Sequence, residues 1–115
     1  MYQAIKVIDR IPEASADYSK KKALTNLIRS QLSSDELCLL FLNCLDRVVD
    51  DGDFRELLIR YEFLEHIPLA RLNGLYNIKG RDIFIANDRM IAQYIKISAD
   101  GNKISAFGKN ADIFL

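Results

Sequence analysis

The sequence predicts a mainly α-helical fold, a small antiparallel helical array around a buried central helix, and leaves room for a minor β-hairpin near the C-terminus. Two observations carry this prediction. Residues 37–45 contain one polar side chain, Asn43, and follow the helix-start pattern of Ser33 and Glu36. A helix without a polar face belongs inside a core or against a partner. Helical stripes flank this segment through short connections, which favour antiparallel neighbours.

The first helix of the array is expected over residues 2–9. It starts without a cap, as the cut end of a longer helix would, and Ile11-Pro12 breaks it because proline cannot donate a backbone hydrogen bond. Asp17 is the predicted cap of a second helix from Tyr18 to about Gln31. We expect its buried stripe to consist of Leu24, Leu27, Ile28 and Gln31 or Leu32.

Three consecutive lysines, Lys20, Lys21 and Lys22, lie near the start of this second helix, where the helix dipole disfavours cations. Either their tails reach water and the cost is screened, or the lysines serve some purpose other than the stability of this helix. They form the one local basic patch of a chain whose net charge is zero, so the sequence gives no strong nucleic-acid signal.

The central helix is expected from Ser34 to about Val49, covered on every side by its own chain. The acidic loop 50–53 ends it, and Asp53 is the predicted cap of a fourth helix from Phe54 to about Glu65. The buried stripe of that helix would be Phe54, Leu57, Leu58, Tyr61 and Leu64.

After Pro68 the apolar residues follow no clean period. A helix over Arg89–Ile97 is favoured, capped by Asn87 or Asp88. The alternative is a hairpin, because Asp100-Gly101 separates two β-branched segments. Residues 82–85 and 112–115 are each expected to form a short extended piece.

Length and composition predict a single domain over residues 1–115, and we expect it to be the C-terminal part of a longer protein. The apolar runs are too short to cross a bilayer and no secretory signal is present, although a longer parent protein is free to carry a membrane segment. Cys38 and Cys44 face different sides of one helix and read as buried thiols of a cytoplasmic protein.

Tests for catalytic and metal chemistry give no candidate, so no catalytic residue, metal or cofactor is predicted. The loop 50–53 lacks the ligands of a calcium site at the required spacing. His66 is the single histidine, which excludes a closed zinc site of several imidazoles. Its expected place is the last turn of the fourth helix, where the helix dipole favours a cation.

The most informative polar set consists of Arg29, Gln31 and Asn43, to which Tyr61 is added as a fourth member. In one interpretation Asn43 is a buried amide in a structural network, with Arg29 paired to Glu36 or to an acid of the fourth helix. In the other, Arg29, Gln31, Asn43 and Tyr61 form a recognition site for a phage component or a partner domain. Both interpretations are open at the level of sequence.

These residues carry a resemblance to a known family. The matching positions are an Arg-x-Gln-Leu-Ser lead, a Glu-Leu helix start, Phe-x-Asn-x-Leu, and a Tyr before Ile-Pro: Arg29, Gln31, Leu32, Ser33, Glu36, Leu37, Phe41, Asn43, Leu45, Tyr61, Ile67 and Pro68. With Ser-Ala-Phe-Gly at residues 105–108, they resemble the putative phage abortive infection protein family of bacteria, here its C-terminal region. Members of that family look like longer proteins with membrane-spanning helices near the N-terminus.

The resemblance implies an anti-phage system that halts growth or kills the infected host. We assign this region a non-enzymatic role in sensing, docking or oligomerisation, with a protein partner or self-association. The alternatives are a toxin-like enzyme such as a nuclease, which two carboxylates in a pocket with Arg29 or His66 would favour, and an oligomerisation module unrelated to defence. Residues 1–32, 33–67 and 68–115 carry net charges of +3, −6 and +3, which suits charged contacts within the monomer or with a partner.

Overall fold

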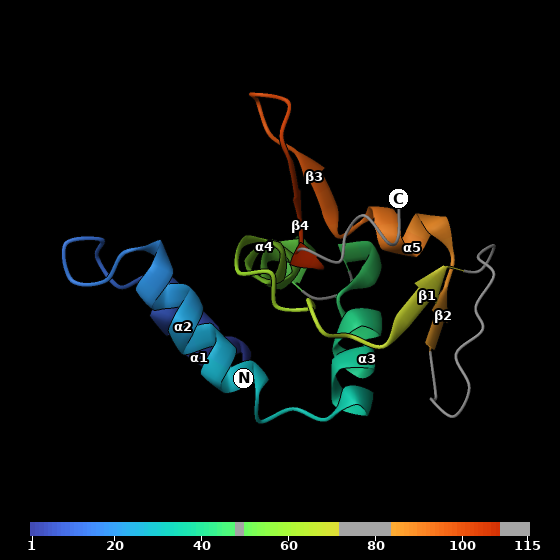
Figure 1. Cartoon of the computed structure of the whole chain (residues 1–115), viewed down its shortest axis with the longest axis horizontal. Helices are drawn as coiled ribbons and strands as arrows, with labels where there is room; N and C mark the ends of the chain where they lie inside the picture. The colour runs from blue at the N-terminus through green and yellow to red at the C-terminus, as the bar shows by residue number, and fades with distance from the viewer. Residues whose placement is uncertain (48–49, 72–83, 109–115) are drawn as a thin grey trace.

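The computed structural model describes residues 1–47, 50–71 and 84–108 of the chain (Figure 1). The described helices are α1 (Tyr2–Asp9), α2 (Tyr18–Arg29), α3 (Ser34–Asn43), α4 (Asp53–Arg60) and α5 (Asp88–Ala92). The described strands are β1 (Leu69–Arg71), β2 (Phe84–Ala86), β3 (Ile95–Ile97) and β4 (Lys103–Ser105). The prediction of a mainly α-helical fold with a minor hairpin near the C-terminus is confirmed.

The elements form a helical body with two small sheets attached (Figure 1). Helices α1 and α2 lie side by side at one end, α3 and α4 occupy the middle, and the β3–β4 hairpin projects away from the body. Strands β1 and β2 form a parallel pair beside α3. None of the helices in the described part of the chain has the length and apolar character that crossing a membrane needs.

The predicted helix starts are confirmed where a polar side chain makes the cap. The Asp17 carboxylate accepts a hydrogen bond from the Lys20 backbone N–H at 3.0 Å, and α2 begins at Tyr18, directly after this cap. Ser33 and Glu36 form the complete capping box of α3. Helix α4 differs from expectation, because it begins at Asp53 with Gly52 (φ 90°) in the cap position and no side-chain cap.

Both central helices end earlier than predicted. Helix α3 stops at Asn43 instead of Val49, because the backbone N–H of Asp46 (φ 59°) donates to the side chain of Gln93 at 2.7 Å instead of continuing the helix. Helix α4 stops at Arg60 instead of Glu65. Val48 and Val49 lie outside the described residues.

A Schellman motif terminates α4, with Glu62 (φ 50°) in the left-handed position that glycine usually occupies. The backbone N–H of Phe63 donates to the Leu58 carbonyl at 2.9 Å, and that of Glu62 donates to the Ile59 carbonyl at 3.2 Å. The Leu64 N–H turns away and donates to the Ala106 carbonyl at 2.9 Å. The local Schellman turn therefore ends α4, and the Leu64–Ala106 hydrogen bond ties the segment after it to the C-terminal part of the chain.

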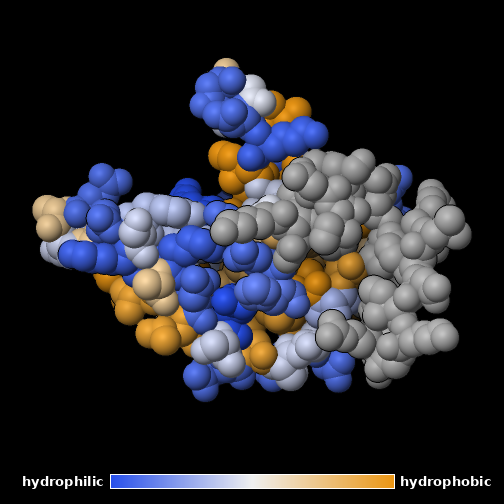
Figure 2. Space-filling view, in the orientation of Figure 1, coloured by the Kyte–Doolittle hydropathy of each residue, from blue (hydrophilic) through white to orange (hydrophobic). Residues whose placement is uncertain are grey.

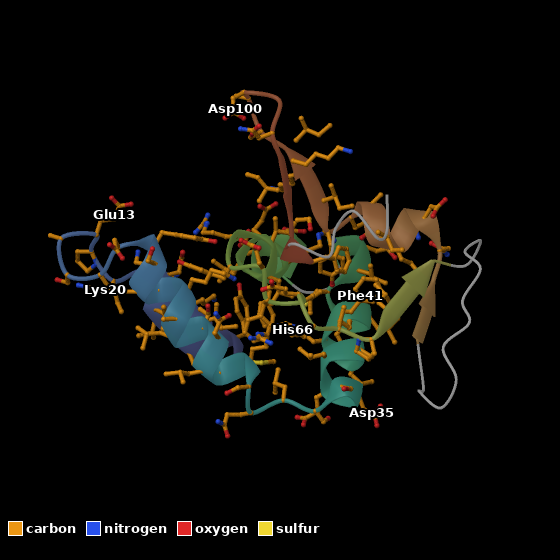
Figure 3. All side chains as sticks on the ribbon, in the orientation of Figure 1. Glu13, Lys20, Asp35, Phe41, His66 and Asp100 are labelled. Carbon is orange, nitrogen blue, oxygen red and sulfur yellow. The ribbon has the colours of Figure 1, made fainter. Side chains whose placement is uncertain are left out.

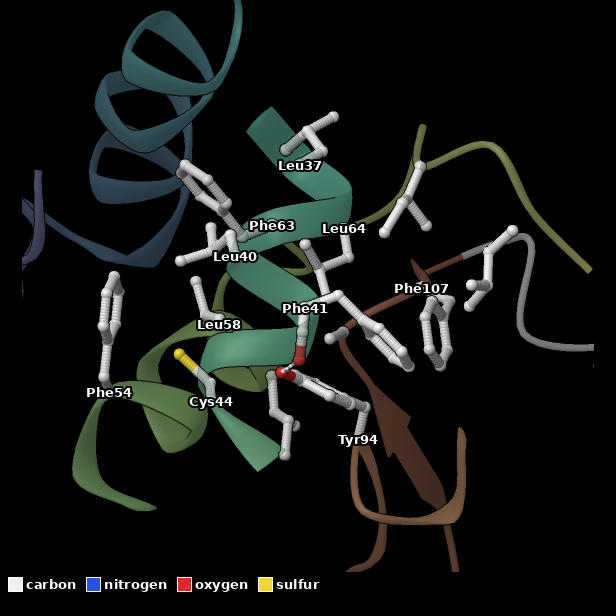
Figure 4. Packing of buried hydrophobic residues seen from close by; sticks show 14 of the residues in the cluster. Leu37, Leu40, Phe41, Cys44, Phe54, Leu58, Phe63, Leu64, Tyr94 and Phe107 are labelled. Carbon is white, nitrogen blue, oxygen red and sulfur yellow. Dashed lines mark hydrogen bonds between the residues drawn. The ribbon is translucent and has the colours of Figure 1, made fainter. Parts of the chain in front are cut away.

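The core is aromatic where α3 meets the C-terminal segment (Figure 4). The rings of Phe41 and Tyr94 stack with their centroids 4.8 Å apart, and Phe107 packs against both. The buried Tyr94 hydroxyl donates to the Phe41 carbonyl at 2.6 Å. This contact anchors the base of the hairpin on α3.

Both alternatives for the C-terminal part describe a portion of it correctly. Helix α5 ends at Ala92, so the helix predicted to Ile97 is too long. Residues 95–105 form the alternative hairpin, with β3 antiparallel to β4 and Gly101 (φ 85°) in its turn. The extended piece predicted over 82–85 overlaps β2, whereas 82–83 and the piece predicted over 112–115 lie outside the described residues.

Candidate functional site

The structure does not gather the four residues predicted for recognition. Gln31 is exposed just before α3, and Asn43 is exposed at its C-terminal end, so a helix of roughly 15 Å separates them. Asn43 is not the buried amide that the structural network required. Arg29 is half-buried, and its Nε has no hydrogen-bond partner among the residues that the structure describes. Their role in binding stays a prediction.

Tyr61, the fourth residue, belongs to a polar junction between α1 and α4. Its buried hydroxyl donates to Asp9 Oδ1 at 2.6 Å, and Arg60 Nη1 donates to the same oxygen at 2.6 Å. Burial opposes the negative charge of Asp9, but the hydrogen bonds from Tyr61 and Arg60 outweigh it and lower the pKa of the carboxyl. Burial and the neighbouring Asp9 raise the pKa of Tyr61.

The lysine run at the start of α2 completes this junction. Lys21 Nζ donates to the Asp9 carbonyl at 2.9 Å, and Lys22 Nζ donates to the Tyr61 carbonyl at 2.9 Å. These carbonyls lie at the C-terminal ends of α1 and α4, where a cation is favoured by the helix dipole. The interpretation that all the tails reach water is wrong for Lys21 and Lys22, which act as caps for other helices.

A cleft of about 290 Å³ lies over this junction, lined by Asp9, Glu13, Tyr18, Lys21, Arg60 and Tyr61. It holds two carboxylates, but with Lys21 and Arg60 in place of the Arg29 or His66 that the nuclease alternative required. Asp9 has a lowered pKa and Tyr61 a raised pKa, so neither exchanges a proton readily near neutral pH. The hydrogen bonds of Asp9, Lys21 and Tyr61 link the ends of α1, α2 and α4.

Two further chemical expectations are resolved by the fold. His66 is exposed and follows the Schellman turn, so its predicted place in the last turn of a helix is wrong. Cys44 is buried and Cys38 is half-buried, both as free thiols, and burial raises the pKa of the Cys38 thiol. Within residues 1–47, 50–71 and 84–108, no group of three or more His, Cys, Asp and Glu side chains is placed to hold a metal ion.

A second, larger cleft of about 500 Å³ lies between α4 and the β3–β4 hairpin. Ile59 and Ile104 contribute its apolar surface, and Tyr18 forms a wall shared with the first cleft. An ion pair between Lys96 and Glu56 ties the hairpin to α4 across this cleft.

Helix α2 is turned so that its polar face is inside. Thr25 is 0% exposed and Lys21 is 9% exposed, whereas Leu24 is exposed and Leu27 is 64% exposed. The stripe predicted to be buried is therefore wrong at Leu24 and Leu27, although Ile28 does pack against the core. The side chains of Lys21 and Thr25 are both satisfied, because Lys21 caps α1 and the Thr25 hydroxyl donates to the Lys22 carbonyl at 2.9 Å.

Helix α3 is also open to solvent on one side. Its inner face buries Leu37, Leu40, Phe41 and Cys44, whereas Leu39 is 57% exposed and Leu42 is exposed. The expectation that the chain covers α3 on every side is therefore wrong. In Figure 2 apolar side chains interrupt the hydrophilic surface along the end of the molecule that α1 and α2 form. The candidate functional site is thus an interaction surface on the outer faces of α2 and α3.

The sequence contained one signal for this arrangement. Cations in the first turn of α2 are unfavourable within that helix, which indicates that Lys21 and Lys22 serve a contact elsewhere. If they face inward, Leu24 and Leu27 must face outward, because these positions lie on another side of a helix with 3.6 residues per turn. Apolar periodicity alone favoured the opposite orientation.

Comparison with known proteins identifies a family for the larger part of the chain. The sequence model of the family described as "putative phage abortive infection protein" matches residues 1–72. The family predicted from the Arg29–Pro68 motifs is confirmed, and the matched region extends to the N-terminus. Residues 105–108, which contributed to the resemblance, lie outside it. No curated protein and no solved structure matches the chain significantly.

Proposed function

We propose a non-enzymatic role in protein binding for this chain, which belongs to the putative phage abortive infection protein family. In this proposal the domain senses, docks or oligomerises through the outer faces of α2 and α3 when the host is infected. The observation that carries the proposal is the outward placement of leucines on two helices that follow each other in the chain. The cytoplasm is the compartment that such a response to phage requires.

The energetics favour a partner for these faces. Burying a leucine side chain contributes roughly 1.5–3 kcal/mol relative to leaving it in water. Helices commonly bind through a few apolar anchors at spacings of three and four residues. Leu24 with Leu27, and Leu39 with Leu42, follow that spacing on exposed surface. A partner that covers one of these pairs would gain several kcal/mol before the entropic cost of association.

The polar junction also supports a non-enzymatic role, because its groups are poorly suited to acid–base catalysis. The hydrogen bonds of this junction link three helices, because Lys21 of α2 and Tyr61 at the end of α4 both donate to Asp9 of α1. A catalytic acid or base works best with a pKa near the working pH, which the lowered pKa of Asp9 opposes. The cleft therefore offers structural groups in place of a proton donor and acceptor.

Plaque counts on a host that expresses the protein test the proposal. We expect Leu27→Glu and Leu39→Glu each to abolish protection while circular dichroism and thermal melts stay as in the wild type, because both side chains are exposed. Ile97→Glu is the matched control, since Ile97 is 71% exposed on the hairpin, away from α2 and α3. Full protection by both leucine variants would overturn the proposal.

A second candidate function is a toxin-like enzyme such as a nuclease, which would have to rest on Asp9 and Glu13, the two carboxylates of the cleft, without the Arg29 or His66 expected beside them. Glu13→Gln separates the two candidates, because Glu13 is exposed and its loss leaves the fold intact. Loss of protection in this variant alone would support the enzyme. An oligomerisation module unrelated to defence predicts that plaque counts do not change when the protein is removed.

A further inference from the structure

The outer faces of α2 and α3 carry matching rows of side chains. The α2 row consists of Lys20, Leu24 and Leu27, and the α3 row consists of Asp35, Leu39 and Leu42. All six side chains are exposed. In each row a charged residue is followed by leucines four and seven positions later, the alternation of four and three residues that forms the seam between packed helices.

The two rows are complementary in charge as well as in spacing. If an α2 row lies parallel to an α3 row, Lys20 faces Asp35, Leu24 faces Leu39, and Leu27 faces Leu42. A parallel pair of two α2 rows would oppose Lys20 to Lys20, and a parallel pair of two α3 rows would oppose Asp35 to Asp35. Like charges on facing helices discriminate against such partners. Among parallel arrangements, the charges therefore favour contact between unlike rows.

The rows of one molecule do not meet each other. Lys20 lies at the α1–α2 end of the structure, and Asp35 lies at the far tip of α3 (Figure 3). Leu27 and Leu39 remain 64% and 57% exposed, which excludes contact between the rows within the chain. The complementary row must come from a second molecule.

We propose that the α2 row of one copy docks on the α3 row of a second copy, so that the protein self-associates head to tail. This inference rests on the proposed function and names its partner as the same chain. Each added copy leaves one α2 row and one α3 row free, because the contact joins two different surfaces. Such heterologous contacts build rings or open filaments instead of closed dimers.

The contact is small, so the association is weak and depends on concentration. Its anchors are the two leucine pairs, and the exposed ion pair of Lys20 with Asp35 changes affinity by about two- to fivefold. Lys20→Glu or Asp35→Lys alone should weaken association by that factor. The double charge swap should restore it, because the opposite charges again face each other.

A mixing experiment with the full chain tests the direction of the contact. Leu27→Glu breaks the α2 row, and Leu39→Glu breaks the α3 row. Analytical ultracentrifugation from micromolar to near-millimolar protein should find wild type and Ile97→Glu associating, and each leucine variant monomeric. An equimolar mixture of the two variants should form a 1:1 dimer and no larger species, since it contains one intact row of each kind.

Three outcomes overturn the inference. Wild-type protein that stays monomeric throughout has no such contact. A single leucine variant that still dimerises has a symmetric interface, with α2 on α2 or α3 on α3. A mixture that stays monomeric has no complementary rows. If the wild type is monomeric but Leu27→Glu still loses protection against phage, only this inference fails. If association occurs and protection survives both variants, the proposed function fails instead.

Discussion

Lys21 offers the sharpest test of how this fold is held together, because its neighbour Lys20 is a matched control. Lys21 is 9% exposed and its Nζ caps α1 through the Asp9 carbonyl at 2.9 Å. Methionine keeps most of the apolar stem and removes the charged donor. A hydrogen bond to a charged group contributes about 1.5–3 kcal/mol, and the loss is reduced because an ammonium no longer has to be desolvated. We therefore expect Lys21→Met to lower the free energy of unfolding by about 1–2 kcal/mol.

Lys20→Met should behave differently, although it is the same substitution one position away. Lys20 is exposed in the first turn of α2, so its removal should change stability by less than about 0.5 kcal/mol. Urea denaturation followed by circular dichroism measures both values, and each kcal/mol corresponds to about 4 °C in Tm for a domain of this size. Equal losses in the two variants would refute the assignment of Lys21 as a cap for α1.

Three further predictions follow from contacts already described. The folded pKa of Asp9 is lowered from 3.8, so the stabilisation that Asp9 contributes is present above that value and is lost as the pH falls through the lowered pKa. Tyr61→Phe removes one of the hydrogen bonds to the carboxylate and should raise the pKa of Asp9. An NMR titration that finds the same Asp9 pKa in this variant as in the wild type would contradict the reasoning. Glu62→Gly should raise stability by roughly 0.5–1 kcal/mol in thermal melts, because relief of the left-handed strain exceeds the added chain entropy; a destabilised variant would refute this. Asn43→Leu should change stability by less than about 0.5 kcal/mol, since Asn43 is exposed, and a loss above about 2 kcal/mol in denaturant melts would restore the buried network.

The sequence predicted the parts of the fold that depend on local chemistry. Asp17 and the Ser33–Glu36 pair each satisfy backbone donors within three residues, so their role can be derived without knowing the fold. The Asp100-Gly101 turn was readable for the same reason, although the choice between helix and hairpin was not. The family was also readable, because its motifs are sequence patterns around α3 and after α4 that can be matched without the fold.

The sequence did not predict where α3 and α4 end, because a glutamate takes the left-handed position after α4 that glycine usually occupies, and distant groups bind the chain that follows each helix. Gln93 takes the backbone N–H of Asp46, and the Ala106 carbonyl takes that of Leu64. These partners lie about 40 residues or more along the chain from the groups they bind, beyond the reach of any local rule. The same cause hid the candidate site, since only the contacts of Lys21 with α1 reveal which face of α2 is outside.

The lysine caps also couple the unfolding of α1, α2 and α4. Tyr18, Lys21 and Lys22 bind carbonyls at the ends of α1 and α4 from one side of α2. Lifting α2 would strip donors from both helices in a single event, so the amide protons of α1, α2 and α4 should exchange with solvent at a common rate. A partner that binds the outer leucines of α2 therefore acts on the helix that caps both α1 and α4.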